Sequence, residues 1–440
     1  MMQASARFIC VAGAFCLAGT FTPDVAGAQP LSLETCRGLA LRANLQAAQA
    51  HGQLKSAEAD VTAARSSFLP SVSLSGGFSK TEDAFELPIG GGFVFLDKSW
   101  STGLSANLTV FDAGGNVFGY QRATRARDAA DHQLLATRQS VIYETEVRFF
   151  DVIRQQELLE VALKSTELSQ EQLKKTEAMK QLGASTQADV YKAEVENSNA
   201  RLEEIRARRN LRVSKASLAA YIGRDPGTEI EIDGQLPELE VAFDLSTALE
   251  RARESNPSLK AARLSRESSK AGVRGAKSDR YPTVSVFTQT SWNNFELSMW
   301  DDDHVETRYG ASLNFNLFDG FLTKSNIRRA ESALVVAEKS LSSAERDVLF
   351  QVEQAYLDLE VAREAIVVAG DAVRSSEEDL RLARERFKIG EGTILDVIDA
   401  QVNLRRALST EVASRFDARL AHVALRNAIG DAGVPASGDQ

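Results

Sequence analysis

Two carboxylates in the last fifth of the chain have a spacing that could do chemistry. Asp396 and Asp399 stand three residues apart in a segment predicted to be helical, so both lie on one helix face. If several chains brought this pair around one axis, the ring would attract cations and repel anions. In a related segment Asp189 matches Asp396, but Lys192 matches Asp399. A solvated pair of acids beside a turn is the alternative interpretation.

Other residue types that carry catalysis or bind metals form no recognisable pattern. No Gly-X-Ser-X-Gly motif occurs. The histidines lack the spacing of metal ligands; they are His51, His132, His304 and His422. The run from Asp301 to His304 could bind a cation, but a solvated acidic loop is the favoured interpretation. We therefore predict no enzyme, no cofactor and no metal site.

The first 28 residues have the features of a secretory signal peptide. Arg7 supplies a positive start, residues 8–17 are apolar, and Ala26-Gly27-Ala28 provides small residues for cleavage. Only Cys36 would remain afterwards, so no intramolecular disulfide can form. Cys36 could be a reactive thiol, although a packed helix residue is the favoured role. The formal net charge of −10 argues against nucleic acid as a partner.

The rest of the chain contains two copies of one plan. Leu33-Glu34-Thr35-Cys36 aligns with Leu245-Ser246-Thr247-Ala248, and Leu182-Gly183-Ala184-Ser185-Thr186 aligns with Ile389-Gly390-Glu391-Gly392-Thr393. We predict repeat 1 at 29–222, a linker at 223–243, repeat 2 at 244–430 and a tail at 431–440.

The residue pattern of each copy predicts, in order, a helix, a strand pair, a very long helix, a tight turn and a final helix. The ranges in copy one are 31–66, 68–111, 112–182 and 184–222. Those in copy two are 244–279, 281–318, 319–389 and 391–429. Asp112 and Asp319 should N-cap the long helices where a strand ends. The tight turns contain Leu182, Gly183, Ile389 and Gly390.

The strands are predicted from alternation. Leu104, Ala106 and Leu108 alternate with Ser105 and Asn107, over a length typical of membrane-spanning strands. The three tryptophans, Trp100, Trp292 and Trp300, lie in these windows, as interfacial aromatics would. A half-buried strand of a soluble sandwich is the alternative.

The long helices carry apolar residues at a 4-3 spacing, which predicts supercoiling. In copy two these positions are Ala330, Leu334, Ala337, Leu341, Ala344, Val348, Ala355, Leu359, Ala362, Ile366, Ala369 and Val373. We expect two stacked shorter helices to cover the span of each long helix, which is about 105 Å in copy one. These are residues 184–222 and 244–279 for the long helix of copy one, and residues 31–66 and 391–429 for that of copy two.

Four strands are too few to close a membrane barrel, for which eight is about the minimum. Unpaired strand edges in lipid would cost several kcal/mol per group. Several chains must therefore share one barrel; two chains supply eight strands and three supply twelve, and the strand count alone permits either.

Three segments resemble the TolC family: Phe-Asp-Ala-Gly-Gly ending at Gly115, Phe-Asp-Gly ending at Gly320, and residues 387–401. The resemblance covers essentially the whole mature chain. It implies an α+β membrane protein whose four transmembrane β-strands contribute to a trimeric 12-stranded β-barrel in the outer membrane, continued by an α-helical coiled-coil barrel through the periplasm. The implied function is the exit duct of a tripartite efflux pump or type I secretion system.

The implied partners are two identical chains, outer-membrane lipid, a periplasmic adaptor (membrane fusion) protein and an inner-membrane RND or ABC transporter. The resemblance also places Asp396 and Asp399, with Asp189, at a pore constriction in the periplasmic tip, and makes the two tight turns candidate adaptor contacts. Their alternative role is helix reversal through glycine.

Two departures from the family pattern are present. Copy one has Asn44-Leu45 where copy two has Asn256-Pro257, and Gly392 replaces a basic residue of gated members. The second departure puts the usual closing ionic links in doubt. A periplasmic adaptor or structural coiled coil without a pore is the competing interpretation of the chain.

Overall fold

The structure is a computed structural model that describes residues 30–89, 92–233, 244–294 and 305–431. The elements of the first half are α1 (Leu33–Ala43), α2 (Leu45–Ser66), β1 (Ser71–Ile89), β2 (Gly92–Phe111), α3 (Gly115–Gln181) and α4 (Gln187–Tyr221). Those of the second half are α5 (Leu245–Ser255), α6 (Pro257–Ser278), β3 (Thr283–Asn294), β4 (Val305–Asn314), α7 (Leu322–Ile389) and α8 (Ile394–Ile429). The predicted signal peptide, Trp300 and the run from Asp301 to His304 lie outside the described residues.

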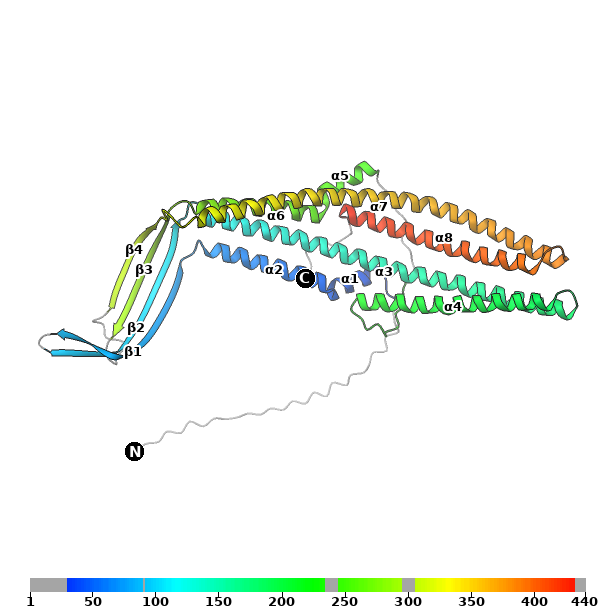
Figure 1. Cartoon of the computed structure of the whole chain (residues 1–440), viewed down its shortest axis with the longest axis horizontal. Coiled ribbons are helices and arrows are strands. Elements are labelled where there is room, and N and C mark those ends of the chain that lie inside the picture. Colours follow the sequence, from blue (N-terminus) through cyan, green and yellow to red (C-terminus); the bar gives the residue numbers. More distant parts are fainter. Residues whose placement is uncertain (1–29, 90–91, 234–243, 295–304, 432–440) are drawn as a thin grey trace, which may run out of the picture.

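The strands lie together at one end of a long molecule, and the helices run away from them (Figure 1). They form one antiparallel sheet in the order β1-β2-β3-β4. In its register, Leu74 pairs with Leu104, and Leu108 pairs with Val286. Because side chains alternate between faces, these apolar residues share one face of the sheet.

Hydroxyl groups line the opposite face of the sheet. Ser73 pairs with Ser105 with their hydroxyl oxygens 2.8 Å apart, and Thr109 Oγ1 lies 3.4 Å from Ser285 Oγ. The predicted alternation is therefore present as one apolar and one polar face. β4 ends at Asn314, so the predicted strand extension through residues 315–318 was wrong. The chain leaves the sheet there to enter the turn before α7.

Two helices of unusual length form the body of the molecule. α3 has 67 residues and α7 has 68, which gives each a length of about 100 Å. α4 folds back along α3, and α8 along α7 (Figure 1). Most of the predicted 4-3 positions of α7 are buried, among them Leu341, Val348 and Leu359.

The upper helices pack differently from the prediction in one respect. α6 lies between α3 and α7 and contacts both, which agrees with its predicted place beside the long helix of copy one. α2, however, packs along α3 and not along α7 within the same chain. Within one chain α7 therefore contacts α5, α6 and α8, whereas α2, which was expected to stack with α8 along the span of α7, contacts α3 instead.

The N-terminal helix of each copy is broken, although each was predicted as continuous. Asn44 ends α1 and N-caps α2, where its Oδ1 accepts from Gln46 N at 2.8 Å. Asn256 does the same between α5 and α6, accepting from Leu259 N at 3.2 Å. An asparagine cap thus breaks the helix in copy one without the proline present in copy two.

The long helices begin three residues later than predicted, and their N-cap positions are Gly114 and Phe321. Both N-cap residues have a left-handed backbone, with φ of 87° and 71°. The prediction that Asp112 and Asp319 occupy the N-cap was therefore wrong in position. Each aspartate stands two residues before the N-cap, and its carboxylate nevertheless accepts a hydrogen bond from an N–H of the first helical turn. Asp319 Oδ2 lies 2.7 Å from Thr323 N.

The core is densest at mid-length, where α1, α3, α4 and α8 meet. Phe149, Phe416 and Leu218 are almost completely buried there. The link between α4 and the N-terminal helices is also tight: Gly223 has φ of 78°, and a Cβ added to it would lie 2.4 Å from Ala43 Cβ. Glycine is required at this position for both reasons.

Candidate functional site: the helix tips and the groove below the sheet

The two turns at the far end of the molecule present apolar side chains to solvent. Leu182 is 85% exposed and Ile389 is 68% exposed. Each is followed by a glycine in the left-handed region, Gly183 at φ 75° and Gly390 at φ 80°. The predicted turn residues therefore form the α3–α4 and α7–α8 reversals.

The helices that leave these turns begin with matching capping boxes. Thr393 N donates to Asp396 Oδ2 at 2.8 Å, and Asp396 N donates to Thr393 Oγ1 at 3.2 Å. Thr186 and Asp189 make the same exchange at 3.0 and 3.2 Å. This capping role was not among the predictions, although a threonine three residues before an acid is a recognisable cap pattern.

These hydrogen bonds hold both carboxyls in the ionised form. The N–H and hydroxyl of Thr393 lower the pKa of Asp396, the N–H contribution being the larger. For Asp189 the hydroxyl of Thr186 is the main cause of a lowered pKa, followed by its N–H, and Lys192 Nζ lies 3.7 Å from the carboxylate. Both acids therefore carry negative charge close to the tip.

Asp396 and Asp399 lie on the solvent side of α8. Both are exposed, whereas Val397 and Ala400 between and beside them are buried against α7 with Phe387. The predicted shared face of the two carboxylates is thus compatible with the packing of the helix. Asp189 lies at the other turn and is half-buried.

Gly392 lies in a closely packed part of the α7–α8 turn. A Cβ added there would lie 3.0 Å from Arg386 Cβ and 3.1 Å from Phe387 N. A larger side chain at this position therefore requires the turn to shift.

A polar contact between α4 and α8 was not predicted from the sequence. Arg405 Nη1 lies 3.7 Å from Glu196 Oε1, and burial raises the pKa of Glu196 while Arg405 opposes the shift. Gln401 is only 8% exposed, and neither atom of its amide has a partner within the described part of the chain. This contact connects the α3–α4 and α7–α8 hairpins.

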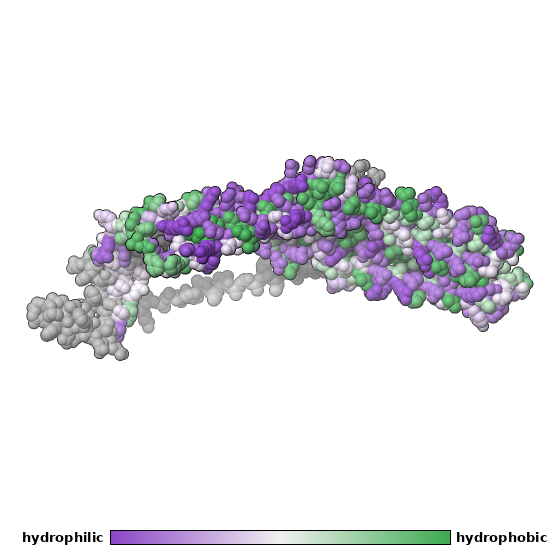
Figure 2. All heavy atoms as spheres, turned by 45° about the horizontal axis from the view of Figure 1, so that its top comes forward, coloured by the Kyte–Doolittle hydropathy of each residue, from purple (hydrophilic) through white to green (hydrophobic). Residues whose placement is uncertain are grey.

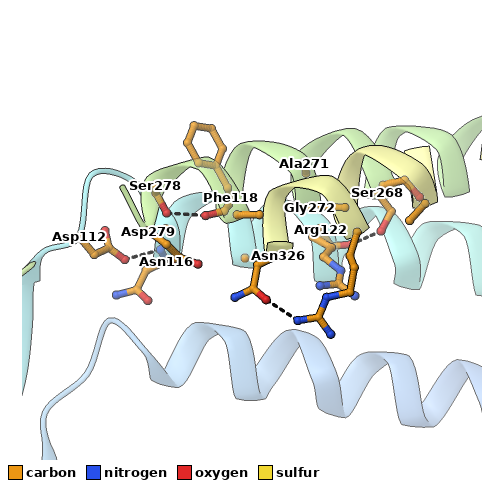
Figure 3. Close-up of a pocket in the computed structure, with 18 of the residues that line it drawn as sticks. Asp112, Asn116, Phe118, Arg122, Ser268, Ala271, Gly272, Ser278, Asp279 and Asn326 are labelled. Carbon is orange, nitrogen blue, oxygen red and sulfur yellow. Dashed lines mark hydrogen bonds between the residues drawn. The ribbon is translucent and has the colours of Figure 1, made fainter. Parts of the chain in front are cut away.

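A groove of about 830 Å³ lies at the other end of the helices, directly below the sheet (Figure 3). Its walls come from α3, α6 and α7, and many of its side chains are small. Figure 3 shows Asp112 and Asp279 toward the sheet and Arg122 farther along the groove. The hydroxyl of Ser268 joins two walls by donating to Arg122 O at 3.0 Å.

Within the described residues no cluster of three or more His, Cys, Asp or Glu side chains could hold a metal ion. No helix in that same part of the chain has the length and apolar character needed to cross a membrane.

Comparisons with known proteins agree with this architecture. The family described as outer membrane efflux protein matches residues 37–224 and 248–431, one range in each half. The chain is 26% identical to the outer membrane protein TolC of Vibrio cholerae over 84% of both chains. It is also 26% identical to the protein CyaE of Bordetella pertussis, covering 93% of this chain and 85% of that protein.

Solved structures share the fold. The outer membrane protein VceC from Vibrio cholerae has a TM-score of 0.79 at 20% identity, covering 90% of this chain and 96% of that one. The Campylobacter jejuni outer membrane channel CmeC has a TM-score of 0.81 at 19% identity, covering 92% and 87%. With its two-part family match and its α+β architecture of sheet and paired long helices, the chain belongs to the TolC-like family of outer membrane efflux proteins, which are channels of the outer membrane.

Proposed function

We propose that this chain is one protomer of a homotrimeric exit duct that conducts solutes or polypeptides passively across the outer membrane and periplasm. One observation carries the proposal: the sheet has an apolar and a polar face, and the outer edges of β1 and β4 have no strand partner in the described residues. Such edges are not tolerated in lipid. Pairing β4 of one copy with β1 of the next satisfies them, and three copies give twelve strands.

The polar face would then line the conduit and the apolar face would meet lipid. The same closure brings the exposed flank of α7 against another copy, which supplies the missing partner for α2. The exposed apolar residues of α7 that this contact would cover include Val335, Phe350, Leu357 and Val361. The duct is therefore a property of the assembly.

We place the constriction of the duct at the tips. Three copies would bring Asp396, Asp399 and Asp189 around one axis, where ionised carboxylates attract cations. The capping boxes support this role because they favour the charged form of Asp396 and Asp189. The alternative for these acids is helix capping alone.

The exposed turns at Leu182, Gly183, Ile389 and Gly390 would contact a periplasmic adaptor, which connects the duct to an inner-membrane transporter of the RND or ABC type. One relative supports an export role by its name, the outer membrane efflux protein BepC from Brucella suis. Apolar side chains exposed at a tip are suited to such a protein contact.

Two measurements test the proposal. Native mass spectrometry of the full chain purified in mild detergent should give a trimer, and planar-bilayer recordings should give stable conductance steps. A monomer without conductance would favour the competing adaptor interpretation and overturn the duct.

Block by multivalent cations tests the constriction separately. Asp396→Ala combined with Asp399→Ala should abolish the block, whereas Asp358→Ala combined with Glu360→Ala makes the same charge change far from the tip and should retain it. If both double variants are blocked like the wild type, the acidic ring is not the constriction.

A further inference from the structure

The helix α6 is strongly basic, in contrast to the chain as a whole. It carries six basic residues and one acidic residue, Glu267, in a chain of net charge −10. The basic residues are Lys260, Arg263, Arg266, Lys270, Arg274 and Lys277. The helix that corresponds to it in the first repeat, α2, has two basic and two acidic residues. Equivalent positions in the two repeats therefore differ in charge.

Part of this charge is neutralised by acids on neighbouring turns or on α7. Lys277 Nζ lies 3.1 Å from Glu331, and Arg263 lies 3.8 Å from Glu345. Three arginines around the groove of Figure 3 have no carboxylate at ion-pair distance among the described residues: Arg122 on α3, Arg274 on α6 and Arg329 on α7. Asp112 and Asp279 also line the groove, at its sheet end, so the unpaired positive charge is available at the Arg122 end.

Two of these arginines, Arg122 and Arg329, line the groove, and Arg274 lines an adjoining hollow. Glycines let α3 and α6 approach closely: a Cβ on Gly115 would lie 2.9 Å from Ser278 Oγ, and one on Gly272 would lie 3.6 Å from Arg122 Cδ. The side chain of Arg329 donates to Asn326, which holds it along the same wall. Ser265 and Ser269 add hydroxyl donors. A second hollow, lined by Arg125, Lys270 and Arg274 and also by Glu267, adjoins the groove at Ala271.

Exposed apolar side chains surround the sheet end of the groove. Phe68 packs edge-to-face with Tyr120, and Phe318 with Phe321. Phe318 is 76% exposed. Figure 2 shows apolar surface gathered where the helices meet the sheet, next to polar surface along the helices. A ligand with an anionic group and an apolar part matches this combination of surfaces.

We propose that the α3–α6–α7 groove binds a phosphate group, held by Arg122 and Arg329 with serine hydroxyls, at the boundary between the sheet and the helices. Guanidinium groups recognise phosphate by paired, charge-assisted hydrogen bonds. The phosphate can belong to a phospholipid headgroup or to a soluble solute in the duct. The site is independent of the acidic tips, which attract the opposite charge.

The test uses the full chain purified in detergent and two probes. Native mass spectrometry counts phosphatidylglycerol retained from mixed phosphatidylglycerol and phosphatidylcholine nanodiscs, and equilibrium dialysis measures binding of glycerol 3-phosphate. Arg122→Gln combined with Arg329→Gln should weaken binding of the recognised probe at least about tenfold, because each guanidinium contributes charge-assisted bonds. If the double variant loses binding of phosphatidylglycerol alone, the recognised phosphate is that of a lipid headgroup. If it loses binding of glycerol 3-phosphate, the recognised phosphate is that of a soluble solute.

Lys55→Gln combined with Arg65→Gln is the matched control, because it removes two positive charges from the repeat-related helix α2. It should leave binding unchanged. A separate measurement needs no variant: phosphate should protect Arg122 and Arg329 of the wild-type protein from phenylglyoxal. Equal binding by both double variants, or no protection by either probe, overturns the proposal.

Discussion

Thr393 and Asp396 exchange hydrogen bonds across the first turn of α8, at 2.8 Å from Thr393 N to the carboxylate and at 3.2 Å from Asp396 N to the hydroxyl. One carboxylate thus starts a helix and also supplies negative charge at the proposed constriction. These two roles can be separated, because Asp399 lies on the same exposed side and is not part of the capping box.

Thr393→Ala should loosen the start of α8. Loss of a threonine cap costs about 1 kcal/mol, so amide exchange at Ile394–Val397 should accelerate by roughly fivefold. Hydrogen–deuterium exchange of the assembled protein measures this. Asp399→Ala is the control and should leave these amides unchanged; equal acceleration in both variants would contradict the capping role.

Asn256→Ala should destabilise the protein more than Asn44→Ala. Both asparagines cap a helix, but Asn256 is buried and its Nδ2 also donates to Ala428 O of α8 at 2.9 Å. Removing that group leaves a buried carbonyl without a donor, which costs about 1–3 kcal/mol beyond the cap. Thermal unfolding in detergent compares the two variants, and equal midpoints would contradict the cross-helix role.

Gly223→Ala should be more harmful than Gly183→Ala. The two glycines have similar left-handed backbones, at φ 78° and 75°, so an alanine costs about 1 kcal/mol at each. At Gly223 the new Cβ also meets Ala43, whereas nothing lies within 4 Å at Gly183. Overpacking adds about 1–3 kcal/mol there. Similar thermal midpoints for the two variants would show that this packing is not tight.

Glu146 makes an acid-dependent contribution to stability. Burial raises the pKa of its carboxyl, and the paired guanidinium of Arg37 opposes that shift. A raised pKa means that the folded state binds more protons, so this contribution is present below the unfolded pKa and is lost as the pH rises through the folded pKa. Relative to Glu146→Gln, the wild type should therefore gain thermal stability as the pH falls from about 7 to about 4. Parallel pH profiles would contradict this.

Cys36 should be unreactive in the native protein. It is fully buried, and burial raises the pKa of the thiol to about 11 although Arg224 opposes the shift. Because the thiolate is the nucleophile, N-ethylmaleimide at about pH 8 should label the protein only after denaturation. Cys36→Ser combined with Leu182→Cys places a thiol at an exposed turn and should be labelled in the native state.

The sequence by itself determined the repeated plan, the four alternating strands, the long helices and the two glycine turns. Each depends on a local pattern: a period of two in Leu104–Val110, a 4-3 spacing in α7, and a glycine at Gly183 and Gly390. The two capping boxes also follow a local pattern, a threonine three residues before an acid.

Only the tertiary structure decided which distant residues meet. α2 lies along α3, Asn256 reaches the end of α8, and Arg405 meets Glu196 between two hairpins. It also set the starts of the long helices at Gly115 and Leu322, because left-handed turns precede them. These features depend on how helices of similar composition pack. A contact between two distant segments produces no periodic residue pattern in the sequence of either segment, so it cannot be predicted from such a pattern.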